Sequence, residues 1–183
     1  IDPPQKHMCN SGGSDWFRAS FCNAVRIGRR LYMDNQAEPL TPGTPGAVQE
    51  ACSWRASVTN LRVVEAGDTV GYDAAWTAPR RTRVATVCVG YGDGLYYPLA
   101  EAGGPLLVGE QRARLLATCM DQCFVDVTDI PCRAGDEVTF FGQSSGGAAM
   151  PIQELGKFMH VEGVYFYSFL SPRVARVYEG LEP

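Results

Sequence analysis

The sequence predicts a mainly β protein in which residues 47–183 form one domain. Short segments rich in Val, Thr, Leu and Phe alternate with turn residues, at spacings of roughly 8–20 residues and without a helical pattern between them. Several such strands favour a closed barrel or a sandwich over a parallel α/β sheet. The expected strands lie within Ser53–Val64, Arg83–Val89, Leu106–Val108, Arg114–Thr118, Phe124–Val127 and Glu137–Phe141.

Two turns of this domain echo each other in sequence. Residues 66–68 and 134–136 both read Ala-Gly-Asp, and each precedes a β-forming segment. Glycine tolerates a positive φ, so we expect similar bends at both places.

One helix is predicted near the C-terminus. Pro151 suits a first helical position, and Ile152, Leu155, Phe158 and Met159 recur at three- and four-residue steps. The helix is expected to cover one side of the barrel.

The N-terminal part differs in composition. Residues 36–46 hold three prolines and two glycines, a stiff connector that excludes both helix and central strand. We therefore expect residues 1–46 to be the tail end of a larger domain plus a linker, and residues 47–183 to be the β domain.

Composition and charge exclude several functional classes. With 45% hydrophobic and 20% charged residues the chain can form a packed core, and its net charge of -4 provides no basic surface for nucleic acid. No apolar run of about 18 residues and no signal-peptide core are present, so we expect a cytoplasmic protein without a membrane partner.

Cysteine and histidine usage argues against cross-links and metal. The seven cysteines are odd in number and lack a framework spacing, which indicates free thiols in a reducing compartment. The chain has two histidines, far apart, so we expect no metal site.

Three strings place reactive groups beside apolar strand ends: residues 70–72 (Val-Gly-Tyr), 89–94 (Val-Gly-Tyr-Gly-Asp-Gly) and 119–122 (Cys-Met-Asp-Gln). A tyrosine beside glycine could be an acid or base if its anion were stabilised. More often, such a pair is a turn followed by a half-buried aromatic ring. No nucleotide-binding glycine motif is present, and residues alone leave the function open.

In order along the chain, however, seven motifs resemble the alanine racemase family. The first two resemble elements at the end of the family's (β/α)8 barrel, and the other five resemble its C-terminal β domain. The motifs are His7-Met8-Cys9-Asn10-Ser11, Val25-Arg26-Ile27-Gly28, Val70-Gly71-Tyr72, Gly90-Tyr91-Gly92-Asp93-Gly94, Cys119-Met120-Asp121-Gln122, Val125-Asp126-Val127-Thr128-Asp129 and Ser171-Pro172-Arg173-Val174.

The resemblance implies an enzyme that depends on pyridoxal 5'-phosphate and interconverts L- and D-alanine for peptidoglycan. In the family, a barrel lysine forms the Schiff base and acts as one base, and a tyrosine from the partner subunit acts as the other. Tyr72 resembles that catalytic tyrosine. Two bases on opposite faces of Cα give inversion. The resemblance also implies a homodimer whose substrate is a small-molecule amino acid, alanine.

The resemblance also assigns binding residues. Arg26 matches the arginine that faces the cofactor's pyridine nitrogen, and Ser11, Gly28 and the backbone of Arg29 match positions that contact its phosphate. Met120 matches the position whose main-chain N–H binds the substrate carboxylate, and Tyr91 matches a tyrosine of the active-site entrance.

The chain departs from the family at several positions. Asp73 stands where the family has glycine, Thr118 where it has arginine, and Arg29, residues 95–97 and Ala175 also differ from expectation. Asp73 would raise the pKa of the Tyr72 phenol if both faced one pocket.

The family's lysine motif has no counterpart here, since Lys6 and Lys157 are the only lysines. We therefore expect the C-terminal part of a longer racemase, inactive alone and unable to bind cofactor covalently. The alternatives are a racemase for serine or a broader set of amino acids, and a β-barrel interaction module without catalysis.

Overall fold

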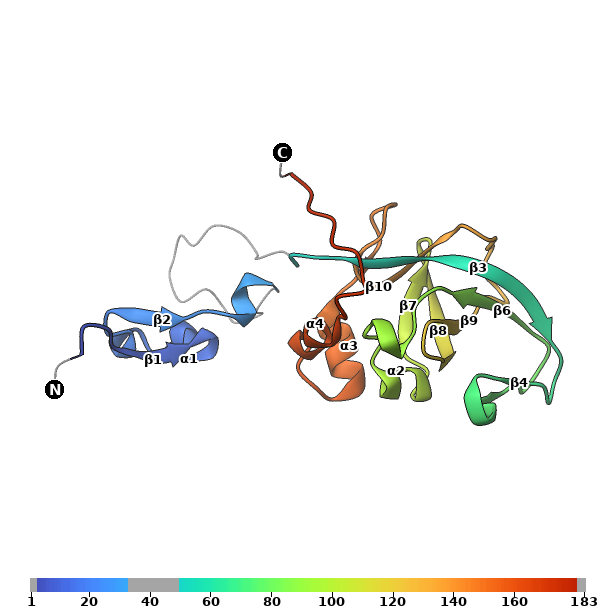
Figure 1. Ribbon diagram of the computed structural model, residues 1–183, viewed down its shortest axis with the longest axis horizontal. Coiled ribbons are helices and arrows are strands. Elements are labelled where there is room, and N and C mark those ends of the chain that lie inside the picture. The colour runs from blue at the N-terminus through green and yellow to red at the C-terminus, as the bar shows by residue number, and fades with distance from the viewer. Residues whose placement is uncertain (1–2, 33–49, 181–183) are drawn as a thin grey trace. The chain divides into compact units, whose positions relative to one another are not determined.

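The computed structural model describes residues 3–32 and 50–180 (Figure 1). The chain divides into two compact units, Ile1–Cys52 and Ser53–Pro183. The predicted boundary after residue 46 lies outside the described residues.

The N-terminal unit is built around two parallel strands. Strands β1 and β2 pair in parallel, with His7 opposite Ala24 and Asn10 opposite Arg26. Parallel neighbours need a crossover connection, and a helix and a 3-10 turn supply it here. The order is strand–helix–strand, and the assignment of this unit to a (β/α)8 barrel stays a prediction. The elements are β1 (His7–Asn10), α1 (Ser11–Trp16), η1 (Arg18–Ser20), β2 (Ala24–Arg26) and η2 (Arg29–Leu31).

The C-terminal unit is mainly β, as predicted, and each of the six expected segments contains a strand. Its strands are β3 (Trp54–Val64), β4 (Thr69–Val70), β5 (Trp76–Thr77), β6 (Thr82–Val87), β7 (Pro105–Val108), β8 (Gln111–Thr118), β9 (Cys123–Asp126), β10 (Glu137–Gln143) and β11 (Ala149–Met150). Its helices are η3 (Tyr72–Ala74), η4 (Tyr91–Asp93), α2 (Tyr97–Glu101), α3 (Ile152–Met159) and α4 (Val164–Phe169).

Six of these strands close into an antiparallel barrel in the order β3-β6-β9-β8-β7-β10. The closing strand β10 pairs with β3 on one side, where Val138 lies opposite Ala56, and with β7 on the other, where Val138 lies opposite Val108. Its end, at Gly142 and Gln143, pairs with β11 instead. Closure leaves no unpaired edge along the ring, so the barrel alternative to a sandwich is correct.

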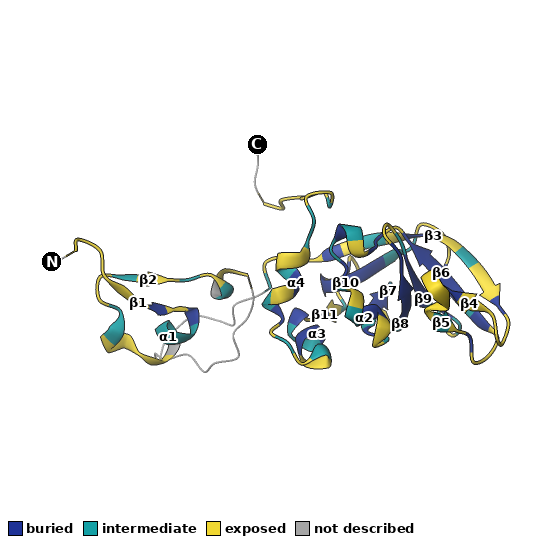
Figure 2. Ribbon diagram, turned by 60° about the horizontal axis from the view of Figure 1, so that its bottom comes forward, coloured by how far each residue is buried: buried dark blue, intermediate teal, exposed yellow. Residues whose placement is uncertain are grey.

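The barrel strands carry the core. Val84, Val125 and Val138 are fully buried, and Leu115 and Phe141 are each 1% exposed. Figure 2 shows the buried residues concentrated on the strands of the barrel. Helix α3 adds Ile152 and Leu155 to the buried set, as the helical pattern predicted, whereas Phe158 stays exposed. Pro151 is the residue before the helix and not its first residue.

The two Ala-Gly-Asp turns have the same structure, as predicted. Gly67 and Gly135 have φ values of 93° and 92°. In each turn the aspartate carboxylate accepts a hydrogen bond from the main-chain N–H three residues earlier, at 2.8 Å, from Glu65 to Asp68 and from Arg133 to Asp136. The aspartate thus fixes the bend that the glycine permits.

Two further findings concern the fold as a whole. All seven cysteines are free thiols. None of the helices within residues 3–32 and 50–180 has the length and apolar composition that spanning a bilayer requires.

Candidate functional site

Two candidate site residues of the C-terminal unit lie in neighbouring loops at one end of the barrel. Cys123, at the start of β9, lies opposite Val87 at the end of β6 and opposite Thr118 at the end of β8. The loops that follow β6 and β8 therefore leave the barrel side by side. These loops carry Tyr91 and Met120.

Main-chain hydrogen bonds join the two loops. The N–H of Tyr91 donates to the carbonyl of Cys119 at 3.0 Å, and the N–H of Gly92 donates to the carbonyl of Met120 at 2.8 Å. Gly90 is required by close approach, since a Cβ there would lie 2.3 Å from the Cys119 carbonyl oxygen. Tyr91 and Met120 are thus held at a fixed separation by the backbone.

Asp93 ties this glycine-rich turn to a distant segment. Its carboxylate accepts a hydrogen bond from the Gly90 N–H at 3.0 Å and lies 3.4 Å from Nε of Arg173. The main-chain carbonyl of Asp93 accepts a hydrogen bond from the Ser171 N–H at 3.0 Å. Sequence reasoning gave neither Asp93 nor Arg173 a role, although the three-residue spacing from Gly90 to Asp93 is a known capping signal.

Tyr72 lies in the hairpin of β4 and β5, which packs on strand β8. Val70 belongs to a buried cluster with Ala117 and Cys119. Gly71 has a φ of 87°, and a Cβ there would lie 2.8 Å from Cβ of Ala117. The Tyr72 side chain is 55% exposed. The phenol is therefore presented to the outside, next to the strand that leads into Met120.

The residue after Tyr72 explains one departure from the family pattern. Asp73 has φ 52° and ψ 31°, and Ala74 has φ 54°, both in the left-handed region. Glycine is the residue that takes this conformation at no cost, and aspartate tolerates it better than most. Asp73 therefore has a backbone conformation that would also suit the glycine expected at this position from the resemblance.

Aromatic rings surround the glycine-rich turn. Tyr91 and Tyr97 are 37% and 42% exposed, with ring centroids 6.0 Å apart. Tyr96 stacks on Phe169 at 4.9 Å and meets Phe166 edge-on at 5.8 Å. Helices α2 and α4 are joined to the turn through these rings.

Met120 offers an open main-chain donor. Its residue is 53% exposed, and no acceptor for its N–H occurs among the residues that the structure describes. A solvated N–H at a loop between two strands can bind a carboxylate oxygen.

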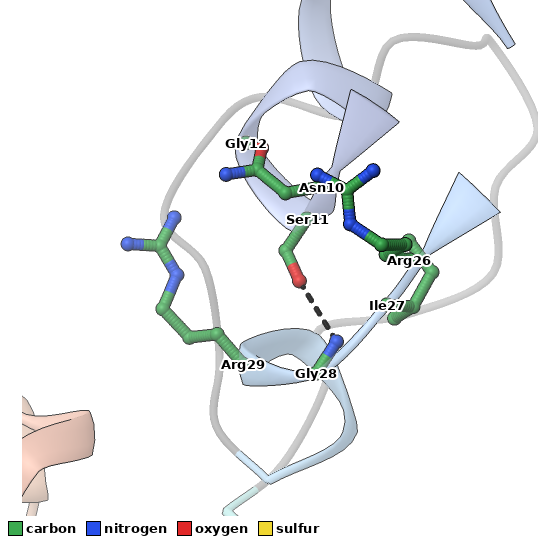
Figure 3. Close-up of a pocket in the computed structure, with 7 residues that line it drawn as sticks. All are labelled: Asn10, Ser11, Gly12, Arg26, Ile27, Gly28 and Arg29. Atoms are coloured by element: carbon green, nitrogen blue, oxygen red, sulfur yellow. Dashed lines mark hydrogen bonds between the residues drawn. The ribbon is translucent and has the colours of Figure 1, made fainter. Parts of the chain in front are cut away.

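The N-terminal unit brings together the four residues predicted to bind cofactor. An open hollow of about 510 Å³ is lined by Asn10, Ser11, Gly12, Arg26, Ile27, Gly28 and Arg29. In Figure 3 the two arginines lie on either side of the bond between Ser11 and Gly28.

Hydrogen bonds fix the polar groups of this hollow. The N–H of Gly28 donates to Oγ of Ser11 at 3.1 Å, and Oδ1 of Asn10 accepts from the N–H of Gly13 at 2.9 Å. Ser11 is only 7% exposed, yet its own hydroxyl hydrogen has no acceptor within residues 3–32 and 50–180. A buried donor in this condition is suited to an anion.

Arg26 is held by a histidine. Its Nη1 lies 2.7 Å from Nδ1 of His7. A guanidinium can only donate, so Nδ1 accepts and this contact requires an imidazole that carries no hydrogen on Nδ1.

Two buried cysteines and the possible metal ligands among the described residues bear on other kinds of chemistry. Burial raises the pKa of the Cys123 thiol, and burial also raises that of Cys132, so both thiols are poor nucleophiles. In the described part of the chain, no three His, Cys, Asp or Glu side chains are grouped so that they could hold a metal ion.

The fold and these residues define a closed antiparallel barrel domain in which two neighbouring loops at one end carry Tyr91 and Met120. The model of the alanine racemase C-terminal domain family matches residues 51–178. The chain therefore belongs to the alanine racemase family.

Individual relatives agree with this assignment. The alanine racemase of Desulforamulus reducens is 33% identical over 177 residues, which cover 96% of this chain and 46% of that protein. The solved alanine racemase of the D-cycloserine producer Streptomyces lavendulae matches with a TM-score of 0.83 and 29% identity, over 100% of this chain and 47% of that one. The chain thus spans about half the length of these relatives.

A racemase named for another amino acid has a similar fold. The histidine racemase of Leuconostoc mesenteroides matches with a TM-score of 0.76 and 29% identity, over 97% of this chain and 47% of that one. Similarity of fold alone therefore does not determine which amino acid is the substrate.

Proposed function

We propose that the protein carrying this chain is a racemase that interconverts L- and D-alanine, with the Tyr72 phenol as one of its two proton-transfer groups. The observation that carries the proposal is the position of Tyr72, 55% exposed and seated by Gly71 against strand β8. Family membership supports the reaction class. Peptidoglycan synthesis would consume the D-alanine, and the free cysteines are consistent with a cytoplasmic enzyme.

Pyridoxal phosphate is the proposed cofactor, and the residues of the N-terminal hollow fit it. The buried Ser11 hydroxyl has a hydrogen to donate to a phosphate dianion, and Gly28 and Arg29 line the same hollow. Gly28 leaves the hollow open, since nothing lies within 4 Å of a Cβ placed there. The cofactor would supply, when bound, a π-system that delocalises the electron pair left at Cα.

Arg26 would face the pyridine nitrogen. A guanidinium keeps its protons at any pH at which proteins fold, so it donates a hydrogen bond without protonating that nitrogen. The His7 contact holds Arg26 for this task.

The barrel end would bind the amino acid. The open N–H of Met120 would donate a hydrogen bond to one oxygen of the substrate carboxylate, and the exposed ring of Tyr91 would form part of the entrance. The backbone bonds between the two loops would keep both groups in register.

Tyr72 would hold a proton at its hydroxyl oxygen and exchange it with Cα on one face. Inversion needs a second base on the other face. We propose that a lysine of the family's motif, which neither Lys6 nor Lys157 matches, supplies it. We further propose that Tyr72 serves the active site of the partner subunit in a homodimer.

The test replaces Tyr72 by phenylalanine in the full-length, cofactor-loaded protein. Racemisation of alanine should fall by at least about a hundredfold, because one face of Cα loses its proton carrier. In heavy water, one enantiomer should still exchange its Cα hydrogen for deuterium without inverting. Tyr178→Phe, at a ring that is 73% exposed, is the matched control and should retain wild-type turnover.

Wild-type turnover by Tyr72→Phe would contradict the proposal. Comparing turnover of alanine, serine and lysine distinguishes the proposed substrate from serine or a broader set. An interaction module without catalysis would turn over none of them.

A further inference from the structure

Asp93 and Arg173 form an ion pair that has no part in the proton transfer proposed above. The Asp93 side chain is 13% exposed and that of Arg173 is 57% exposed, with Nε of Arg173 at 3.4 Å from Oδ1. The other carboxylate oxygen accepts the hydrogen bond from the Gly90 N–H. A mostly buried carboxylate is stable only while its charge is compensated.

The guanidinium also lies against the loops of the site. A Cβ on Gly92 would be 2.8 Å from the Met120 carbonyl oxygen and 3.0 Å from Nη1 of Arg173. Arg173, the turn and the Met120 main chain are therefore packed together. A shift of one of them displaces the others.

The segment that carries Arg173 is itself fastened to the turn. The Ser171 N–H donates to the Asp93 carbonyl at 3.0 Å. Gly94 has a φ of 109°, and a Cβ there would lie 2.2 Å from the Phe169 carbonyl oxygen. Arg176 closes the segment by donating to the Ser171 carbonyl at 3.1 Å.

We propose that Asp93 and Arg173 are positioning residues of the proposed racemase: together they hold Tyr91 and the Met120 N–H where the substrate needs them, without touching it. This inference rests on the proposed function. The pair joins the C-terminal segment to a turn that backbone hydrogen bonds couple to Met120. Displacement of a binding group by about 1 Å lowers catalysis up to about a hundredfold.

The kinetic test uses Arg173→Met, Asp93→Asn and the double variant in the full-length, cofactor-loaded protein. Each single change should lower kcat/KM by about ten- to a hundredfold, mainly through KM, since Met120 binds the carboxylate before and during reaction. The double variant should be no worse than the singles, because both remove one interaction. Arg173→Lys keeps the charge and should recover most of the loss.

Asp136 offers a matched control. Its carboxylate also accepts the N–H three residues earlier and pairs with an arginine, Arg133, at 3.3 Å, but it lies in the turn before β10. Asp136→Asn should change kcat/KM by less than about twofold.

Amide hydrogen exchange on the 183-residue chain tests, without a measurement of turnover, whether the Asp93–Arg173 pair holds the turn in place. In Arg173→Met, the amides of Tyr91 and Gly92 should exchange at least about tenfold faster, whereas those of the Gly135 turn should not change. Unchanged exchange, wild-type kinetics of Arg173→Met, or losses that multiply in the double variant would each overturn the positioning role. An inactive wild-type protein would instead overturn the proposed function. The exchange result would still show whether Arg173 holds the turn that carries Tyr91 and Gly92.

Discussion

At the scale of single residues, the backbone conformation after Tyr72 is informative about Asp73, which stands where the resemblance predicts glycine. Asp73 and Ala74, directly after Tyr72, both have positive φ values of 52° and 54°. A side chain with Cβ costs about 1–2 kcal/mol in this region. The protein therefore carries conformational strain beside its proposed proton carrier.

Replacing Ala74 by glycine should relieve part of this strain. We expect the free energy of unfolding to rise by about 1 kcal/mol, because glycine adopts the left-handed conformation freely. Urea unfolding of the chain measures it. Ala75 is the matched control: its φ is -51°, in the right-handed helical region, so glycine there should destabilise by about 0.5–1 kcal/mol. A destabilised Ala74→Gly variant would show that the conformation carries no strain.

At the scale of elements, those with a clear local sequence pattern could be predicted, whereas those that depend on tertiary packing could not. The long barrel strands and helix α3 could be predicted, because their apolar residues recur with a regular period. Helices α2 and α4 could not: they are short, and the rings of Tyr96, Phe166 and Phe169 hold them together across the chain. The two-residue strands β4 and β5 are likewise too short to leave a pattern.

The candidate site shows the same division. Tyr72, Tyr91 and Met120 lie in glycine-rich or strand-end strings that draw notice in the sequence. The pairing of Asp93 with Arg173 joins residues far apart in the chain, and no local spacing predicts it.

The tie between β10 and the loop after it gives a pH-dependent prediction. Burial raises the pKa of the Glu137 carboxyl. Hydrogen bonds from the Ser145 hydroxyl and N–H and the charge of Arg55 together lower this pKa by more than burial raises it, so the net shift is downward from the ordinary 4.5. A lowered folded-state pKa stabilises the protein above the unfolded value, and this stability is lost as pH falls through the folded value.

Glu137→Gln should therefore lower the free energy of unfolding at pH 7 by about 1 kcal/mol. The difference from wild type should shrink below pH 4.5 as the wild-type carboxyl takes up its proton. Urea titrations at pH 7 and at acidic pH measure both values. Glu65→Gln, in a pair with Arg81 where the glutamate is 66% exposed, should change little at either pH. A difference that persists at acidic pH would argue against this origin.

At the scale of the whole molecule, the chain holds two sets of proposed site residues in two units. Ser11, Arg26, Gly28 and Arg29 lie in the N-terminal unit, and Tyr72, Tyr91 and Met120 lie in the C-terminal one. In the proposed homodimer each active site draws one set from each subunit.

Hybrid dimers test this arrangement. Full-length Tyr72→Phe and a full-length Arg26 variant that is itself inactive are mixed, unfolded and refolded together. Random pairing leaves about a quarter of the sites with both residues intact if Tyr72 acts across the dimer, so about a quarter of wild-type racemase activity should return. Refolding each variant alone is the control. No recovery in the mixture would place Tyr72 in the site of its own subunit.

The closure of the barrel by β10 also governs the order of assembly. Strand β3 needs β10 as its second neighbour, yet β6, β7, β8 and β9 all stand between them in the chain. A ribosome that releases the polypeptide from its N-terminal end must therefore synthesise the domain as far as β10 before the ring can close. Until then the outer hydrogen-bonding groups of β3 stay available to other nascent strands, which is the interval in which chaperones are most needed.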